Sequence, residues 1–282
     1  MGAHPVPQQI DVQAALGARF DVQAPLRPGA QGAVYRAIRH RNAGGAATGD
    51  EVAVKFYLDP TQNERVEREI RMMTEVRHYS LANLYEHGTV QIQTRQYKYV
   101  VWELINGDPL DTLLTSAGPL QPKLAAIVGK DAATAIAAIW GKRVVHRDVN
   151  PKNIMLRSNR EGAVLLDLGV AKYVDQTTLT APGLTWGTRG YLSPEQMLGL
   201  ELTCQSDVFS LGISIQEALA GRHPTRLDQN LLISGGPRTA TISPSCPVAL
   251  ATIVDRMVSQ RPAHRPAPAL VAEQLAAIVD RV

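Results

Sequence analysis

The stretch 146–153 reads His-Arg-Asp-Val-Asn-Pro-Lys-Asn, and Asp-Leu-Gly follows at 167–169. Asp148 supplies a carboxylate that can orient a hydroxyl nucleophile, while Asn153 and Asp167 supply oxygen atoms of the kind that Mg²⁺ prefers. Transfer of a phosphoryl group from a nucleotide needs such groups, because positioning and charge neutralisation do most of the catalytic work. The pattern therefore indicates a phosphate-handling site.

Two periodicities indicate which elements position these groups. Alternating apolar residues with Gly and Pro punctuation predict strands within 19–57 and 83–103. Apolar residues at helical spacing predict helices within 61–77 and 124–140. Further elements are expected downstream: short strands at 143–145, 154–156 and 163–166, and helices near 205–220, 247–259 and 267–280.

This order of elements predicts an α+β protein with two lobes. The β-rich N-terminal part and the helical C-terminal part are expected to meet near 105–107, where Asn-Gly favours a turn. We expect a loosely ordered leader over 1–18, an N-lobe over 19–105 and a C-lobe over 106–282.

Composition excludes several classes of partner. The 282 residues carry 29 Lys+Arg and 26 Asp+Glu, a net charge of +3 without a basic block, so no binding to nucleic acid is expected. The longest apolar-looking stretch, 124–140, is interrupted by Lys130 and Asp131, so no membrane contact is expected. Only Cys204 and Cys246 occur, which favours a reduced, cytoplasmic location.

Four further motifs stand in a fixed order along the chain: RPGAQGAV at 27–34, VAVK at 52–55, GTRGYLSPE at 187–195 and SDVFSLG at 206–212. Together with the stretch around Asp148, they resemble the motifs of the eukaryotic-type (Hanks-type) serine/threonine protein kinases, in their bacterial branch. The resemblance covers most of the chain. It implies a bilobal kinase-like fold with a small β-rich N-lobe and a larger α-helical C-lobe.

The resemblance also implies an activity: transfer of the γ-phosphate of ATP to Ser or Thr hydroxyls of protein substrates, with autophosphorylation. Mg²⁺ is the implied metal cofactor, with Mn²⁺ as a substitute, and Asn153 and Asp167 are its implied ligands. Asp148 would orient the substrate hydroxyl or accept its proton. Thr188 would bond Asp148, an arrangement that indicates Ser/Thr substrates.

The nucleotide-binding residues are implied in the same way. Lys55 would contact the α and β phosphates, and Glu69 would pair with Lys55 and fix its position. Trp102 would close the pocket behind the base, and the backbone of Glu103 and Ile105 would bind the adenine edge. The other implied nucleotide-binding residues are Arg27, which replaces the first loop glycine, Gly29, Gly32, Val34 and Ala53.

Asn150 departs from the family pattern, which has lysine at this position. That lysine would donate to the transferring phosphate and stabilise the charge that develops during transfer. Asparagine can donate a hydrogen bond but carries no charge, and charge-assisted bonds are roughly twice as strong. Lys152 could supply the missing cation, or it could remain solvated in a slower enzyme; both readings stay open here.

Several residues are expected to frame the site rather than to react. Glu195 would form a buried ion pair with Arg265, and Asp207 would anchor the backbone of the loop around Asp148. His146 is expected to be a packing residue rather than a base.

Arg147 could capture a phosphorylated activation segment. The candidate phosphorylation sites in that segment are Thr177, Thr178, Thr180 and Thr185.

Two other functions remain as alternatives. The first is a pseudokinase that holds a nucleotide or a partner without transfer, which Asn150 and Arg27 favour slightly. The second is a small-molecule phosphotransferase of the aminoglycoside or choline type, in which a non-lysine residue also follows the loop Asp. Such enzymes lack the segment at 187–195, so this segment favours a protein kinase with protein substrates.

Overall fold

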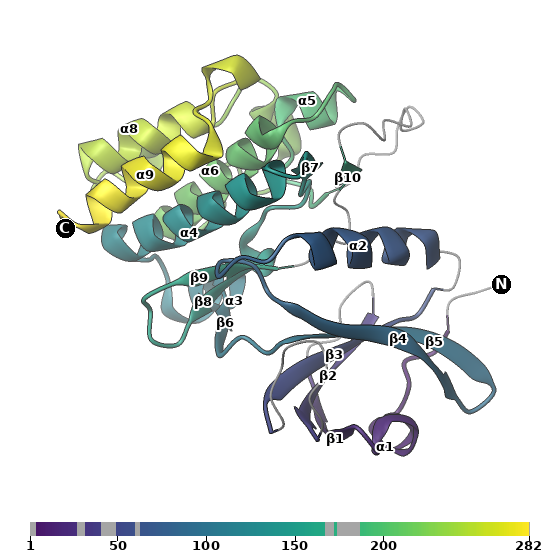
Figure 1. Cartoon of the computed structure of the whole chain (residues 1–282). Coiled ribbons are helices and arrows are strands. Elements are labelled where there is room, and N and C mark those ends of the chain that lie inside the picture. The colour runs from purple at the N-terminus through teal and green to yellow at the C-terminus, as the bar shows by residue number, and fades with distance from the viewer. Residues whose placement is uncertain are drawn as a thin grey trace. The chain divides into compact units, whose positions relative to one another are not determined.

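The computed structural model describes residues 4–26, 32–40, 49–59, 63–166, 172–173 and 187–281, apart from a few side chains within these ranges. The chain divides into two compact units (Figure 1). The N-terminal unit comprises Met1–Arg77 and Ala82–Ile105. The C-terminal unit comprises His78–Leu81 and Asn106–Val282.

A five-stranded antiparallel sheet forms the body of the N-terminal unit, with strand order β1-β2-β3-β5-β4. Its strands are β1 (Phe20–Pro25), β2 (Gly32–Arg39), β3 (Glu51–Tyr57), β4 (Leu84–Ile92) and β5 (Arg95–Glu103). Buried and more exposed residues alternate along much of β3, as expected for a strand with one face on a core. The strands predicted within 19–57 and 83–103 are confirmed.

Helix α1 (Gln9–Leu16) was not expected, because residues 1–18 were predicted to form a loosely ordered leader. Val12 and Leu16 are buried in the same apolar cluster as Phe20 and Phe56. The Gln13 side chain also forms hydrogen bonds with the backbone of β1, as a neighbouring strand would. Its Oε1 accepts from the Val22 N–H at 2.6 Å, and its Nε2 donates to the Phe20 carbonyl at 3.3 Å. These contacts make α1 part of the N-terminal unit.

The predicted helix within 61–77 is α2 (Asn63–Glu75). Its buried residues include Val66, Ile70 and Met73, which recur at helical spacing.

Helices dominate the C-terminal unit, as predicted. They are α3 (Leu110–Ala117), α4 (Pro122–Trp140), α5 (Pro194–Met197), α6 (Cys204–Ala220), α7 (Thr239–Ile242), α8 (Val248–Met257) and α9 (Pro268–Val279). The described part of this unit also contains the short 3₁₀ turns η2 (Pro151–Asn153), η3 (Gln229–Leu232) and η4 (Pro262–His264). The short strands are β6 (Gly107–Pro109), β7 (Val144–Val145), β8 (Ile154–Arg157), β9 (Ala163–Leu165) and β10 (Lys172–Tyr173).

Helices α4, α6 and α9 form the centre of the C-terminal unit, and they pack side by side in Figure 1. Gly129 on α4 lets them approach closely, because a Cβ there would lie 2.7 Å from Ile215 of α6 and 2.8 Å from Leu275 of α9. Asp207 projects from the buried first turn of α6. This helix therefore carries a carboxylate from the core toward the loop that follows β7.

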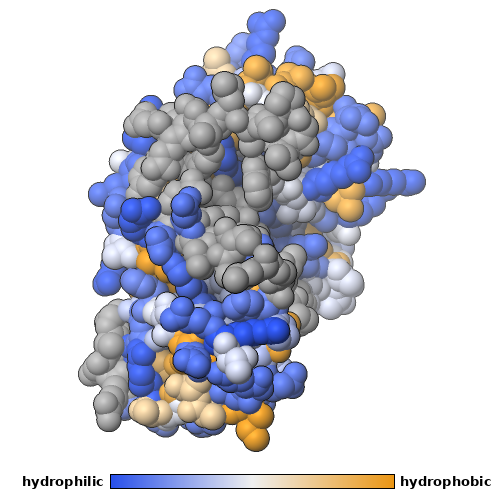
Figure 2. Space-filling model, turned by 90° about the vertical axis from the view of Figure 1, so that its right-hand side faces the viewer, coloured by the Kyte–Doolittle hydropathy of each residue, from blue (hydrophilic) through white to orange (hydrophobic). Residues whose placement is uncertain are grey.

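The coloured surface in Figure 2 is mostly hydrophilic, with separate hydrophobic patches. Exposed large apolar side chains include Leu198, Leu200 and Leu231. Across the described parts of the chain, no helix has both the length and the apolar composition needed to cross a bilayer.

Candidate active site

The side chain of Asp207 anchors the loop after β7. Its carboxylate accepts from the backbone N–H groups of His146 and Arg147, each at 2.8 Å. Burial raises the pKa of Asp207, while the hydrogen bonds from the Arg147 and His146 backbone oppose that shift. The predicted anchoring of the loop by Asp207 is confirmed.

Both ring nitrogens of the fully buried His146 are used inside the protein. Nε2 lies 2.9 Å from the carbonyl oxygen of Leu166, and Nδ1 accepts from the Asp148 N–H at 3.3 Å. A neutral ring with its proton on Nε2 satisfies both bonds. This geometry agrees with a structural role for His146.

Arg147 has a left-handed backbone, with φ of 72°. Its Nε is buried without a hydrogen-bond partner among the described residues, and burial lowers the pKa of its guanidinium. Its carbonyl oxygen accepts from Nε2 of Gln196 at 3.0 Å. The threonines predicted as phosphorylation sites, at 177, 178, 180 and 185, lie outside the described residues.

Three neutral donors hold the carboxylate of Asp148. Oδ1 accepts from the Thr188 backbone N–H at 2.7 Å and from Nδ2 of Asn150 at 2.9 Å. Oδ2 accepts from Nδ2 of Asn153 at 3.1 Å. Thr188 thus binds Asp148 through its backbone. Because the donors carry no charge, the carboxylate is oriented without being neutralised.

The amide of Asn150 is 1% exposed and is engaged at both ends. Nδ2 reaches the Asp148 carbonyl at 3.0 Å and Oγ1 of Thr188 at 3.1 Å, besides the Asp148 carboxylate. Oδ1 accepts from the Lys152 N–H at 3.0 Å. The two amide hydrogens are therefore shared among three acceptors, and Asn150 has no spare donor for a phosphate.

Lys152 is the cationic residue of this loop that remains exposed. Its backbone is fixed by Asn150, but its ammonium group has no ion-pair or hydrogen-bond partner in the described part of the chain. The position leaves a positive charge available two residues after Asn150.

Asn153 satisfies one requirement of a metal ligand. Its Nδ2 donates to the carbonyl oxygen of Asp148 at 2.8 Å and to its carboxylate, so Oδ1 is the atom left to meet a cation. Asp167, the second predicted ligand, lies outside the described residues together with Leu168. The carbonyl end of the Asn153 amide is therefore compatible with the predicted role of this residue as a metal ligand.

The predicted nucleotide-binding residues of the N-terminal unit lie on neighbouring strands. Val34 on β2 pairs with Lys55 on β3, and Ala53 on β3 pairs with Trp102 on β5. The Lys55 ammonium lies 5.0 Å from the centre of the Tyr57 ring.

Glu103 ends β5 and accepts from Nδ2 of Asn83 at 2.7 Å, while Ile105 is buried and Gly32 begins β2. Arg27 and Gly29 lie outside the described residues, as does the side chain of Glu69 on α2. The Lys55–Glu69 pair therefore stays a prediction.

The predicted ion pair between Glu195 and Arg265 is confirmed. Nη1 and Nη2 of Arg265 donate to the two carboxylate oxygens at 2.6 and 3.0 Å, and Ser206 donates to Oε1 at 2.7 Å. Both side chains are buried. Burial opposes ionisation of Glu195, but Arg265 and Ser206 outweigh it and hold the pKa of this carboxyl below its ordinary value.

Two residues that position the segment after Thr188 were missed from the sequence. Gln229 on η3 accepts from the Gly190 N–H at 2.6 Å and donates to the Leu192 carbonyl at 2.9 Å. His223 Nε2 lies 2.9 Å from the Gly190 carbonyl. No signal in the sequence identifies these contacts, because they join residues 33 to 39 positions apart.

Comparison with known proteins gives a consistent result. The family described as protein kinase domain matches residues 20–275. The chain is 32% identical over 229 residues to the serine/threonine-protein kinase PknA of Mycobacterium tuberculosis, covering 79% of this chain and 52% of that protein. It is 30% identical over 256 residues to PknH of the same species, covering 89% and 40%. It is 31% identical over 219 residues to the serine/threonine-protein kinase pkn2 of Myxococcus xanthus, covering 74% and 25%. The chain thus spans about half, or less, of the length of these curated relatives.

Proposed function

The chain belongs to the protein kinase domain family, and we propose that it transfers the γ-phosphate of ATP to Ser and Thr hydroxyls of protein substrates, including its own. The observation that carries this proposal is the carboxylate of Asp148, which Asn150, Asn153 and Thr188 orient and which pairs with no cation among the described residues. Such a group can accept a hydrogen bond from an incoming hydroxyl and direct its oxygen toward a phosphorus atom.

Family members use ATP with a divalent metal ion, generally Mg²⁺, which neutralises phosphate charge when bound. We assign Oδ1 of Asn153 and the carboxylate of Asp167 as its protein ligands, with Mn²⁺ as a substitute metal. The hydrogen bonds that occupy Nδ2 of Asn153 support this assignment, because they leave only the carbonyl end of the amide for a cation.

The nucleotide would be bound by residues of the N-terminal unit. Lys55 would contact the phosphates and Glu69 would hold it in place. The backbone of Glu103 and Ile105 would bind the adenine edge, and Trp102 would limit the depth of the base pocket. The remaining residues of this proposal are Arg27, Gly29, Gly32, Val34 and Ala53.

Lys152 would supply the positive charge that the family places at position 150. The reason is that the Asn150 amide is saturated by bonds to Asp148, Thr188 and Lys152. Lys152 is exposed and its ammonium group is without a partner among the residues that the structure describes. Asn150 would therefore position Asp148, and Lys152 would act on the phosphate.

Arg147 supports a proposal about regulation. A buried guanidinium nitrogen without a hydrogen-bond partner in the described chain is costly, and a phosphate group would satisfy it. Phosphorylation of Thr177, Thr178, Thr180 or Thr185 would provide that group. We also propose a cytoplasmic location, which the two unpaired, buried cysteines support.

A nucleotide-binding pseudokinase is the second candidate, because no cation stands at position 150. Incubation with Mg-ATP labelled at the γ-phosphate separates the two. Wild type should label itself and a generic protein substrate, and Asp148→Ala should be slower by a factor of about 10² to 10⁴. Equal labelling by the two proteins would reject the proposed role of Asp148, and nucleotide binding without any labelling would favour the pseudokinase.

A further inference from the structure

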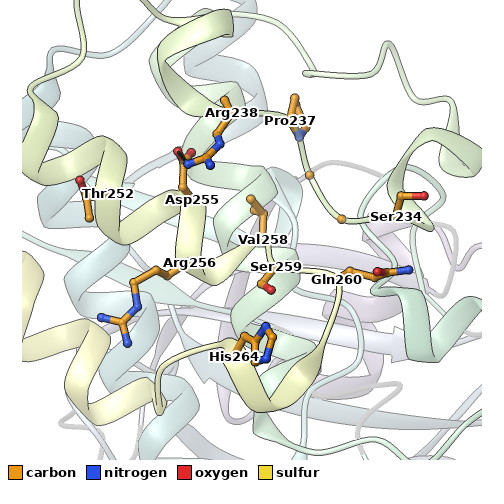
Figure 3. Close-up of a pocket in the computed structure, with 12 residues that line it drawn as sticks. Ser234, Pro237, Arg238, Thr252, Asp255, Arg256, Val258, Ser259, Gln260 and His264 are labelled. Carbon is orange, nitrogen blue, oxygen red and sulfur yellow. Dashed lines mark hydrogen bonds and ion pairs between the residues drawn. The ribbon is translucent and has the colours of Figure 1, made fainter.

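A cavity of about 400 Å³ lies in the C-terminal unit, lined by none of the residues assigned above to transfer (Figure 3). One wall is the stretch 234–238, before α7. The other wall is the end of α8 and the residues after it, including Ser259 and His264. Polar and apolar surface both line it, and the charged side chains of Arg238, Asp255 and Arg256 suit a ligand with a charged or hydrogen-bonding group.

Two glycines hold the walls of this cavity together. Gly235 has φ of 99°, and a Cβ there would lie 2.9 Å from the backbone nitrogen of Gln260. Gly236 donates its N–H to the Val258 carbonyl at 2.8 Å. Backbone therefore packs on backbone between the two walls, so their shape is set without a ligand.

The far wall is also fixed to the core. Arg265 donates from Nε to the Ser259 carbonyl at 2.8 Å and from Nη2 to the Gln260 carbonyl at 2.9 Å. The same guanidinium forms the buried ion pair with Glu195. A ligand in the cavity would thus meet a preorganised surface, which lowers the entropic cost of binding.

The region around the cavity carries a net positive charge. Residues 221–267 contain six arginines and two aspartates, a net charge of +4, whereas the whole chain has +3. One of the six, Arg265, is paired with Glu195. The local excess of positive charge favours an anionic ligand.

The charged side chains that line the cavity also have a net positive charge. Asp255 already accepts from the Thr239 N–H at 2.7 Å and lies 3.3 Å from Nη1 of Arg238, and Figure 3 shows these two side chains pointing toward one another. Arg256 is exposed and has no ion-pair partner in the described chain. One carboxylate is therefore already engaged, while two guanidinium groups still have free donors.

We propose that this cavity binds the phosphate group of a phosphorylated Ser or Thr side chain in a polypeptide. Arginine favours phosphate because its planar donors match two phosphate oxygens at once. The cavity is several times larger than a free phosphate ion, so it has room for the adjoining side chain and backbone. The idea rests on the proposed function in one respect: a Ser/Thr kinase would itself produce such groups.

Fluorescence anisotropy tests the proposal with a labelled peptide that carries one phosphothreonine among neutral residues. The full chain is titrated without nucleotide, so a failure of phosphoryl transfer leaves this result untouched. Wild type should bind the phosphopeptide and not its unphosphorylated form. Arg256→Gln and Arg238→Gln should each weaken binding about tenfold or more, as expected for a lost charge-assisted hydrogen bond.

Arg222→Gln is the matched control, because Arg222 is exposed in the same basic region but does not line the cavity. It should change the affinity less than twofold. Equal weakening in Arg222→Gln and Arg256→Gln would overturn the proposal in favour of diffuse attraction. Binding of both peptides alike, or of neither, would overturn it too. If inorganic phosphate displaced the labelled phosphopeptide at the same concentration as phosphothreonine does, the proposal of a polypeptide ligand would be rejected.

Discussion

Glu195 and Asp148 are both held by several hydrogen bonds in the C-terminal unit, but their donors differ in charge. Glu195 receives two bonds from the guanidinium of Arg265 and one from Ser206, all in a buried setting. Asp148 is partly exposed, and its donors within the described ranges are two side-chain amides and a backbone N–H. The charge of Glu195 is balanced by Arg265, whereas no cation contacts the Asp148 carboxylate among the residues that the structure describes.

This difference in the charge of the donors corresponds to a difference between a structural carboxylate and one that is proposed to act in transfer. A buried carboxylate without a countercharge would cost several kcal/mol, so Glu195 needs Arg265. A carboxylate that must meet a substrate hydroxyl would be weakened as an acceptor by a permanent cation. Neutral donors orient Asp148 and leave its charge available. Asn150, which stands where the family has lysine, fits this arrangement, because under the proposed function Lys152 would supply the cation instead.

Removing one partner of the buried pair should give the largest effect on stability. Arg265→Met should lower the free energy of unfolding by about 3–5 kcal/mol, because Glu195 would remain buried and charged. Chemical denaturation followed by circular dichroism measures this. The double variant Glu195→Met/Arg265→Met should recover part of the loss. A double variant less stable than Arg265→Met would contradict the assignment of the cost to an unpaired charge.

Removing the proposed loop cation should affect the rate and not the stability. Lys152→Ala should slow transfer by about 10- to 100-fold, the value of a charge-assisted hydrogen bond to a phosphate. Introducing Asn150→Lys into Lys152→Ala should restore part of the rate. Lys123→Ala, at an exposed position on α4, is the control. If both single lysine variants keep the wild-type rate, the cation does not come from Lys152.

Removing the Asn150 amide should have a moderate effect on both the stability and the rate of transfer. Asn150→Ala leaves the Lys152 N–H and the Thr188 hydroxyl without their amide partner, which should cost about 1–3 kcal/mol of unfolding free energy. Transfer should slow as well, since Asp148 loses one of its three donors. Thermal melting and labelled ATP measure the two effects. Asn230→Ala, at an exposed site, should change stability by no more than about 0.5 kcal/mol.

The pH dependence of the buried pair should be the smallest effect. Because the pKa of Glu195 is lowered in the folded state, its ionisation stabilises the fold above its ordinary pKa. That stability is lost as the pH falls through the folded-state pKa. Melting temperatures of wild type and Glu195→Gln should therefore converge as the pH falls from 7 into the acidic range. A difference that stays constant down to acid pH would argue against an ionised Glu195.

Much of the fold follows from local patterns. The strands within 19–57 and 83–103 alternate in burial and exposure, and helices α4, α6, α8 and α9 show apolar residues at helical spacing, so both were predictable. Helix α1 was not. Gln8, which precedes the helix at its N-cap, makes no side-chain capping bond, and the apolar residues do not gather on one face, since Ile10 is exposed while Val12 and Leu16 are buried. Its stability comes from packing on a sheet that a local pattern does not reveal.

The site was predictable to the extent that its residues occur in motifs. Glu195–Arg265 and the anchoring by Asp207 follow from the family resemblance and are present. The bonds of Asn150 were not foreseen, because a missing charge says nothing about where an amide will donate. Thr188, one of its partners, lies 38 residues away in the chain. Contacts of this kind depend on tertiary structure alone.

The glutamine contacts of α1 bear on where this protein can be shortened. The family match begins at Phe20, the first residue of β1, and β1 is an outer strand of its sheet. Without residues 4–18, the Val22 N–H and the Phe20 carbonyl would lose Gln13, and an edge open to a strand of another molecule would result. A fragment that begins at Phe20, where the family match begins, is therefore expected to self-associate. A fragment that stays monomeric should include the residues of α1 that precede this match.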